Sequence, residues 1–316
     1  MLSALVMPLV SGARGIFSAP RSLAEAAQGQ AAWSAATAFG LVPSLLLVNP
    51  GIAHGASAGE DSFKLLSSRA LGSDALSYSP GIQSADVLYP DWFAGTWSVE
   101  STTASVNAPL GIDAFGGTNA WEAAQKDIGN TLKYKSRFFE SEGAVIADRL
   151  FNVKAIASVA MGKGAVLGIE GDRSIPKANN LKKYYDGLAA MMNVAITPDQ
   201  SQGDIFDCSL VTVGRCYASD STGGFVAVEK VTQSVSRRMD LLASQPTAPR
   251  IKEIETISLY KTPTGTDSIE AVQRTSTYLS PNEESSRYRS LVSKDVRVRD
   301  TAVDVRSYKL SYRRDT

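Results

Sequence analysis

The stretch that decides the fold is Tyr89-Pro90-Asp91-Trp92-Phe93-Ala94-Gly95-Thr96-Trp97-Ser98-Val99. A Gly-x-Trp followed by alternating residues is typical of the first strand of a small antiparallel β-barrel. The glycine allows a tight turn before the strand, and the tryptophan is expected to plug one end of the barrel. The stretch therefore predicts an architecture, but it specifies no chemistry.

Segments rich in alternating and β-branched residues follow at short intervals. We predict one short helix over 152–161, with Asn152 as its N-cap and Gly162 just past its end. A series of strands joined by short turns predicts a mainly β fold, an antiparallel barrel with insertions whose closure removes the sheet edges. The predicted strands cover residues 95–106, 131–140, 143–151, 165–170, 205–212, 216–219, 224–237, 251–262, 268–279 and 303–313.

The first 58 residues have the composition of a targeting leader. Residues 1–30 are rich in Ala, Ser and Gly with one acidic residue, and an apolar stretch follows from Ala35 to about Val48. A helix breaker and an A-x-A site ending at Ala58 come next, which predicts a bipartite plastid leader directing the chain to the thylakoid lumen. The alternative is an uncleaved membrane anchor, but the apolar stretch is short for a span and is interrupted by Pro43.

The remaining chain is expected to be a soluble protein with one domain. Residues 59–85 are rich in Ser, Gly and Ala and predict a flexible arm, whereas residues 86–316 predict a single β-barrel domain. No apolar run after the leader is long enough to span a bilayer. Without the leader, which holds two of the 32 basic and one of the 32 acidic residues, the net charge is about −1. This balance argues against a nucleic-acid binder and against strong attachment to anionic lipid.

Histidine and cysteine restrict the chemistry. The only histidine, His54, lies in the predicted leader, so the mature chain would lack Ser-His-Asp or Cys-His catalysis and His-built metal sites. No metal site is predicted. Cys208 and Cys216 have seven residues between them, including a possible turn at residues 213–215. They are candidates for a disulfide between two arms of a hairpin, and two free thiols are the alternative.

Several motifs carry a resemblance to a known family. They are Tyr89-Pro90-Asp91-Trp92 with Gly95-x-Trp97, Ile146-Ala147-Asp148-Arg149-x-Phe151-Asn152, Glu229-x-x-x-Gln233-x-x-x-Arg237, Glu253-x-Glu255-Thr256, Gln273, and Tyr278-Leu279-x-Pro281. On these residues the chain resembles an uncharacterised family of cyanobacterial and plastid proteins, defined by a domain of unknown function. The family is similar to the calycins, the superfamily of lipocalin-like barrels, in its Gly-x-Trp opening and in a basic residue on the last strand. The resemblance implies a calycin-like barrel in which Arg313 or Arg314 packs over Trp97, and it implies no established activity.

Polar residues on the predicted strands form a candidate ligand-binding site. Glu229, Gln233 and Arg237 are spaced by four and share one face of a strand, as Glu253 and Glu255 do. If these faces point inward, the polar residues would build a network for a ligand head group or for acid/base chemistry. The alternatives are a solvated outer face, a structural ion-pair network, and a structural cation–π plug at Trp97. The candidate residues are Trp97, Arg149, Glu229, Gln233, Arg237, Glu255, Gln273 and Arg313.

These observations favour a binding protein over an enzyme. The barrel is expected to bind a small apolar molecule such as a pigment, quinone or lipid, and no other cofactor is assigned. A second hypothesis is an accessory or assembly factor of a photosystem or other thylakoid membrane complex. A third is an enzyme that acts on a lipid or carotenoid through carboxylates and tyrosines.

Overall fold

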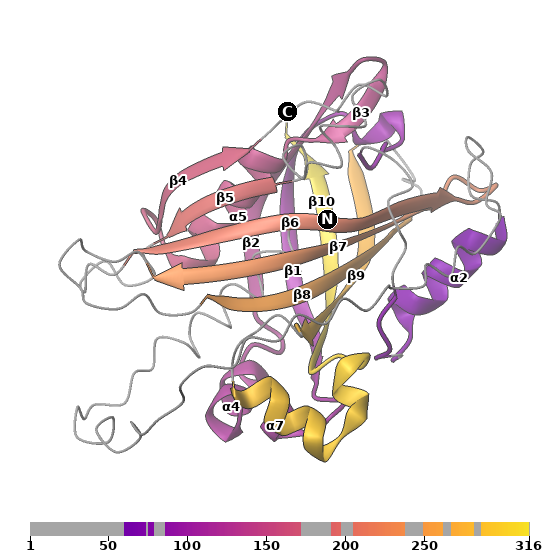
Figure 1. Cartoon of the computed structure of the whole chain (residues 1–316). Helices are drawn as coiled ribbons and strands as arrows, with labels where there is room; N and C mark the ends of the chain where they lie inside the picture. Colours follow the sequence, from indigo (N-terminus) through magenta and orange to yellow (C-terminus); the bar gives the residue numbers. More distant parts are fainter. Residues whose placement is uncertain are drawn as a thin grey trace, which may run out of the picture.

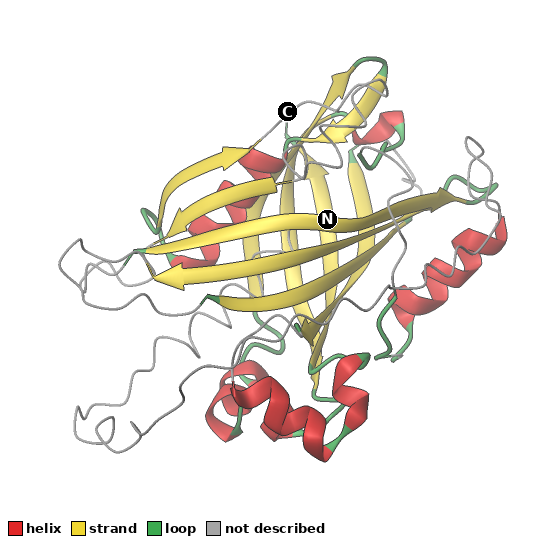
Figure 2. Cartoon of the chain, in the orientation of Figure 1, coloured by secondary structure: helices red, strands yellow, loops and turns green. Residues whose placement is uncertain are grey.

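The fold is built on one antiparallel sheet that curls into a half-barrel (Figures 1 and 2). A computed structural model of the chain describes residues 60–73, 75–78, 86–171, 191–196, 205–237, 249–261, 267–280 and 286–315. The predicted leader, with His54 and the cleavage site, lies outside these residues. The strand order is β3-β2-β1-β10-β9-β8-β7-β6-β5-β4. The prediction of a mainly antiparallel β, calycin-like fold is confirmed.

The strands match the predicted segments closely in the second half of the chain, except that the strands predicted over 205–212 and 216–219 form one continuous strand. Long alternating or β-branched runs give the long central strands, which pair with their neighbours along most of their length. The bounds are β1 (Gly95–Asn107), β2 (Thr131–Ser141), β3 (Ala144–Ala147), β4 (Val166–Gly171), β5 (Met191–Ile196), β6 (Phe206–Ser219), β7 (Phe225–Arg237), β8 (Arg250–Tyr260), β9 (Ser268–Leu279) and β10 (Asp304–Arg314).

Helix α5 (Arg149–Met161) covers the gap between the two edge strands. The edges of the sheet are β3 and β4, and α5 connects them along the chain while packing against β2 and β4. Its buried residues Val153, Ile156 and Ala157 join the main hydrophobic core. A helix, in place of direct pairing between the edge strands, therefore completes the barrel wall.

The start of α5 differs from the prediction. The strand expected over 143–151 ends at Ala147, and the helix begins at Arg149 with Asp148 as its N-cap, whose Oδ1 accepts from the Phe151 amide at 3.1 Å. Asn152 lies inside the first turn. Its side chain accepts from the Arg137 amide at 2.7 Å and donates to the Arg137 carbonyl at 3.0 Å. Asn152 therefore ties the helix to β2 and does not cap it.

Part of the predicted flexible arm is a helix packed on the outside of the sheet. Helix α2 (Glu60–Leu71) contacts β6, β7, β8 and β9. Its buried Leu66 and Ala70 lie against Cys216, Val226 and Ile257 on the outer face (Figure 1). The sheet thus buries apolar side chains on both faces, which explains the nearly continuous burial along β7.

The remaining short helices lie in the connections. Helix η1 (Asp91–Phe93) precedes β1. Two short helices, α3 (Ile112–Phe115) and α4 (Thr118–Gln125), separate β1 from β2. Helices α7 (Ser286–Lys294) and η4 (Val296–Arg299) separate β9 from β10. Residues Leu291, Val292 and Val298 of this last connection pack with Ala114 and Leu279, so α3 and α7 share one small core.

Trp97 plugs one end of the half-barrel, as its position in the sequence predicts. Its ring is fully buried, its Nε1 donates to the Phe93 carbonyl at 2.7 Å, and the Arg314 guanidinium lies 4.3 Å from its centroid. The Arg314 guanidinium also donates to the Ala94 carbonyl at 2.5 Å and to the Trp92 carbonyl at 3.0 Å. Other buried aromatic rings at this end are Tyr89, Phe93, Phe138, Phe225, Tyr260 and Tyr312.

The basic partner of Trp97 is Arg314, and the choice of Arg313 is wrong. Trp97 faces Arg314 across the β1–β10 pairing, whereas Arg313 faces Ser98 and is exposed, because neighbouring residues of a strand point to opposite faces. Gly95 has φ +118°, and a Cβ there would lie 2.8 Å from Arg314 Nη1. The glycine of the Gly-x-Trp motif therefore makes room for the arginine.

Replacing Arg314 should destabilise the fold far more than replacing its neighbour. R314A removes a cation–π contact and two charge-assisted hydrogen bonds, and we expect the free energy of unfolding to fall by about 2–4 kcal/mol. The matched variant R313A removes the same side chain from the exposed face and should change it by less than about 0.5 kcal/mol. Chemical denaturation of both variants measures the difference, and equal losses would contradict the assignment.

The two cysteines lie on one strand and face opposite sides of it. Both are buried free thiols on β6. The register shifts between Thr212 and Gly214, so Cys208 belongs to the inner core and Cys216 to the core under α2. Eight residue steps along a strand separate their Cα atoms by about 26 Å, well beyond disulfide reach. The predicted turn at residues 213–215 is a bulge, and the hairpin disulfide is wrong.

Both cysteines should remain thiols and react slowly. Burial raises the pKa of each thiol to about 12, so the thiolate fraction near neutral pH is very small. Without reductant, we expect slow alkylation of the native protein and two labels per chain after unfolding in denaturant. The label count is read by intact mass, and a chain that takes up label only after reduction would overturn the arrangement.

Candidate functional site

A row of buried polar residues crosses the inner face of the sheet. We define this inner face as the one that carries Trp97, Phe225 and Tyr260. Because alternate residues of a strand share a face, Glu229 of β7 points the same way as Phe225. Its cross-strand neighbours continue the row over β6, β8, β9 and β10. The resulting polar belt consists of Arg215, Glu229, Thr256, Thr275 and Arg306, each at most 4% exposed.

A second row widens this belt toward the aromatic end. Ser258, Gln273 and Tyr308 lie opposite one another on β8, β9 and β10, two residues along from the belt. All three are buried. On the other side of the belt, Val231 and Ile254 are paired and apolar. The polar zone therefore lies between the aromatic end and a row that is apolar on β7 and β8 but continues as Thr277 on β9 and Asp304 on β10.

Glu229 is held as a carboxylate by two arginines. Its Oε1 lies 2.8 Å from Arg149 Nη2 and 2.9 Å from Arg215 Nε. Arg149 pairs in addition with Asp86, which is also buried. Burial alone would raise the pKa of Glu229, but Arg149 and Arg215 outweigh it and lower the pKa to about 2. The pKa of Arg149 is well above its usual value because Asp86 and Glu229 overcome the effect of burial.

Six side-chain atoms of the two rows have no hydrogen-bond partner among the described residues. Each unpartnered buried polar atom destabilises the fold by about 1–3 kcal/mol. A group of such atoms therefore indicates that another molecule supplies the missing hydrogen bonds. The set mixes one acceptor, one donor and four hydroxyls, and a hydroxyl can serve as either donor or acceptor. The atoms are Glu229 Oε2, Gln273 Nε2, Thr256 Oγ1, Thr275 Oγ1, Ser258 Oγ and Tyr308 Oη.

The structure brings together some of the predicted site residues and separates others. Arg149, Glu229 and Gln273 belong to the inner zone. Gln233 is buried on the same face of β7, two inward positions beyond Glu229 and in contact with Cys208. Arg237 is exposed at the end of β7, so it lies away from the zone. Trp97 and the exposed Arg313 also lie outside it, at the aromatic end.

Glu255 faces the opposite side of the sheet from Glu229. It is fully buried under α2, where its Oε1 lies 3.5 Å from Arg69 and 3.4 Å from Arg274, and its Oε2 accepts from the Tyr78 amide at 3.0 Å. Burial raises the pKa of Glu255, although Arg69 and Arg274 oppose the rise. Glu229 and Glu255 are therefore parts of two networks separated by the sheet, and they do not form an acid/base pair.

Sequence reasoning missed residues that belong to the inner zone. Arg215 was hidden because the bulge at residues 212–214 changes which side of β6 faces inward. Asp86 sits at the predicted boundary between arm and barrel, where no strand pattern marks it. Thr256 and Thr275 are paired across β8 and β9, and they could have been found once the register was known.

Two further properties of the described part of the chain bear on function. Within it, no group of three or more His, Cys, Asp or Glu side chains is arranged to hold a metal ion. Its helices are all too short or too polar to cross a membrane.

Comparison with known proteins found one family. A family profile with the description "domain of unknown function (DUF6816)" matches residues 81–316. Searches of curated proteins and of solved structures found no match. The family match begins five residues before Asp86 and covers every residue of the inner polar zone.

Removing the Glu229 carboxylate should destabilise the protein in a pH-dependent way. E229Q leaves Arg149 and Arg215 without their buried anion, and we expect a loss of about 3–5 kcal/mol near neutral pH. Because the folded-state pKa is lowered from 4.5 to about 2, the stabilisation is present above about pH 4.5 and disappears as the pH falls toward 2. Urea denaturation at several pH values measures the gap between wild type and E229Q.

E255Q provides a control of opposite sign. The pKa of Glu255 is raised, so ionisation of this group disfavours the folded state. The free energy of unfolding of wild type should therefore fall relative to that of E255Q as the pH rises. A stability gap for E229Q that stays constant from pH 5 to 2 would contradict the assigned ion pairs.

Proposed function

Since the chain belongs to the DUF6816 family, a family of unknown function, we propose that it is a binding protein for a small amphipathic molecule held inside the half-barrel. The observation that carries this proposal is the group of unpartnered polar atoms in the two inner rows, which lie next to apolar side chains of the main core. A polar group of a ligand would complete their hydrogen bonds, and the apolar walls would take its hydrocarbon part.

The polar end of such a ligand must both donate and accept hydrogen bonds. Oε2 of the ionised Glu229 requires a donor, and Nε2 of Gln273 requires an acceptor. The neighbouring charges are already balanced, because Asp86 and Glu229 face Arg149 and Arg215. An uncharged head group with hydroxyls fits this zone better than an anion, which the Glu229 carboxylate would repel.

The apolar part of the ligand would lie along the barrel axis. Val231, Ile254 and Leu210 line the inner face beyond the polar belt, and the aromatic end closes the other side. A pigment, a quinone or a lipid each combines a hydrocarbon body with a polar end. The expected class of ligand thus changes from a small apolar molecule to an amphipathic molecule whose polar end is also buried.

The cellular setting remains part of the proposal. The composition and order of residues 1–58 support delivery to the plastid thylakoid lumen, where the mature chain would work as a soluble carrier. That setting is rich in membrane pigments, quinones and lipids, which agrees with the ligand class inferred from the interior.

An accessory role in a photosynthetic complex is the second candidate. The observation that favours it is the exposure of apolar residues on and after α2, where Leu65, Leu71 and Leu76 are each more than half exposed. A partner subunit that covered these residues would extend the outer core under α2.

Native mass spectrometry of the protein purified from gently solubilised source membranes tests the two roles. An additional mass of a few hundred daltons that survives buffer exchange is the expected result and identifies the ligand class. Co-purification with subunits of a membrane complex, without a small molecule, would favour the accessory role. A bare chain without either would overturn the binding proposal.

Removing two unpartnered hydroxyls should separate binding from folding. In T256V/T275V the ligand-free protein should keep or gain stability, up to about 1 kcal/mol per site, because buried hydroxyls without partners are removed. Ligand retention should fall about tenfold, as two hydrogen bonds are lost. Occupancy in native mass spectra and denaturation of the delipidated protein provide the two measurements.

S276A is the matched control for this variant. Ser276 is also a buried hydroxyl without a partner, but it follows Thr275 and so faces the outer side of β9. Its removal should leave ligand retention unchanged. Equal loss of retention in S276A and T256V/T275V, or a marked destabilisation by the double variant alone, would argue for a purely structural polar zone.

A further inference from the structure

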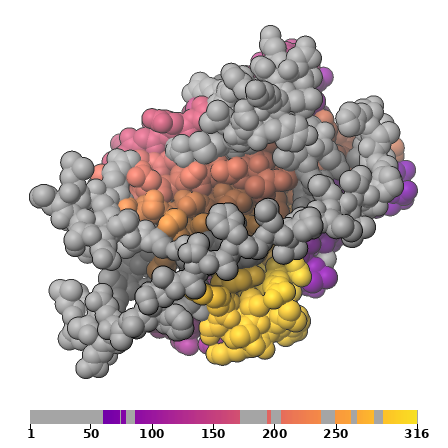
Figure 3. Space-filling view, in the orientation of Figure 1, coloured from indigo at the N-terminus to yellow at the C-terminus, as the bar shows by residue number. Residues whose placement is uncertain are grey.

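A basic lobe projects from the end of the half-barrel that lies opposite Trp97. It consists of residues 286–299, which form α7 and η4 between β9 and β10. Arg314 lies over Trp97 at one end of β10, and the lobe leads into the other end, about 35 Å away along the strand. Figure 1 and Figure 3 show it as the yellow segment below the curled sheet. It is therefore remote from the aromatic end.

The lobe concentrates positive charge, because residues 286–299 hold five basic residues and one acidic residue. Arg289, Lys294, Arg297 and Arg299 are exposed, and Asp295 is the only acidic residue of the segment. Asp295 pairs with Arg297 at 2.6 Å. Across the described ranges, no carboxylate pairs with Arg289 or Arg299. The described part of the chain therefore offers no carboxylate partner to either guanidinium group, which can bind an anion.

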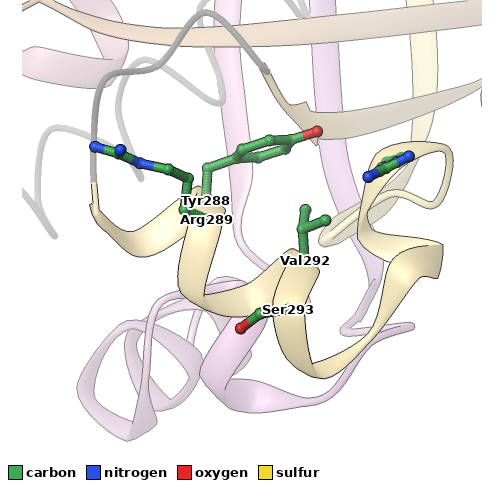
Figure 4. A pocket seen from close by; sticks show the side chains of 5 residues that line it. Tyr288, Arg289, Val292 and Ser293 are labelled. Carbon is green, nitrogen blue, oxygen red and sulfur yellow. The ribbon is translucent and has the colours of Figure 1, made fainter. Parts of the chain in front are cut away.

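Arg289 and Arg299 border a hollow of about 660 Å³ on the surface of the lobe. Tyr288 and Val292 of α7 also line this hollow, together with Ser293 (Figure 4). The lining thus combines an aromatic ring, an aliphatic side chain and two cations. On the adjoining η4, Val296 is 63% exposed between Asp295 and Arg297.

We propose that this basic lobe docks the protein on a membrane surface that contains anionic lipids. Guanidinium groups bind lipid phosphates, and the exposed Val296 with the Tyr288 ring suits the boundary between head groups and acyl chains. A chain whose charges nearly cancel is not drawn to such a surface as a whole. The concentration of cations at one end supplies the attraction and also sets the orientation. The inference does not depend on the interior binding a ligand.

Co-sedimentation of the full chain with lipid vesicles tests the docking. The vesicles contain phosphatidylcholine either alone or with 30% phosphatidylglycerol. A basic residue near an anionic surface strengthens binding about fivefold, so R289Q/R299Q should bind the anionic vesicles about 30-fold more weakly than wild type. The difference should disappear at high salt, where the charges are screened.

The matched control removes the same charge elsewhere. K154Q/K309Q neutralises two exposed lysines, one on α5 and one on β10, and should keep wild-type affinity. Thermal unfolding checks that all variants fold. Equal loss of vesicle affinity in both double variants would overturn the proposal, because binding would then depend on the net charge of the protein and not on the position of the arginines. Binding that is the same for neutral and anionic vesicles would overturn it as well, and it would assign attachment to apolar parts of the chain.

Discussion

The ion pair between Glu229 and Arg149 connects the two halves of this fold. Glu229 lies on β7, in the middle of the sheet, and Arg149 begins the helix that covers the gap between the edge strands. Two buried charges tolerate removal from water only when each has partners, and Arg215 and Asp86 provide the rest. This pair therefore fixes where α5 starts over the interior, and it keeps an ionised carboxylate oxygen directed at the polar zone.

Both faces of the sheet carry a buried polar network. On the inner face Glu229 is fully charged, whereas on the outer face the pKa of Glu255 is raised under α2. The two networks differ because the arginines around Glu229 approach at 2.8–2.9 Å and those around Glu255 at 3.4–3.5 Å. The inner network is thus the one that shapes the environment of a bound molecule.

Much of the β framework could be predicted because it depends on local patterns. Alternation identified β1, β2, β7, β8, β9 and β10 nearly to their ends, and the Gly-x-Trp motif located the aromatic end. The short β3 and the start of α5 were misplaced because Asp148 and Asn152 are both good cap residues. The polar zone was only partly predicted, since Glu229, Gln273 and Arg149 were identified but Arg215, Thr256 and Thr275 were not.

The sequence by itself determined most of the long strands, the plug at Trp97 and the absence of histidine from residues 59–316, because periodicity and composition are local properties of the chain. Only the tertiary structure decided which face each polar residue occupies. One bulge in β6 reverses the facing of every residue after it, so Cys216 lies outside and Arg215 inside. The helix on each side of the sheet then decides which carboxylate meets which arginine, and such contacts between distant segments follow from packing.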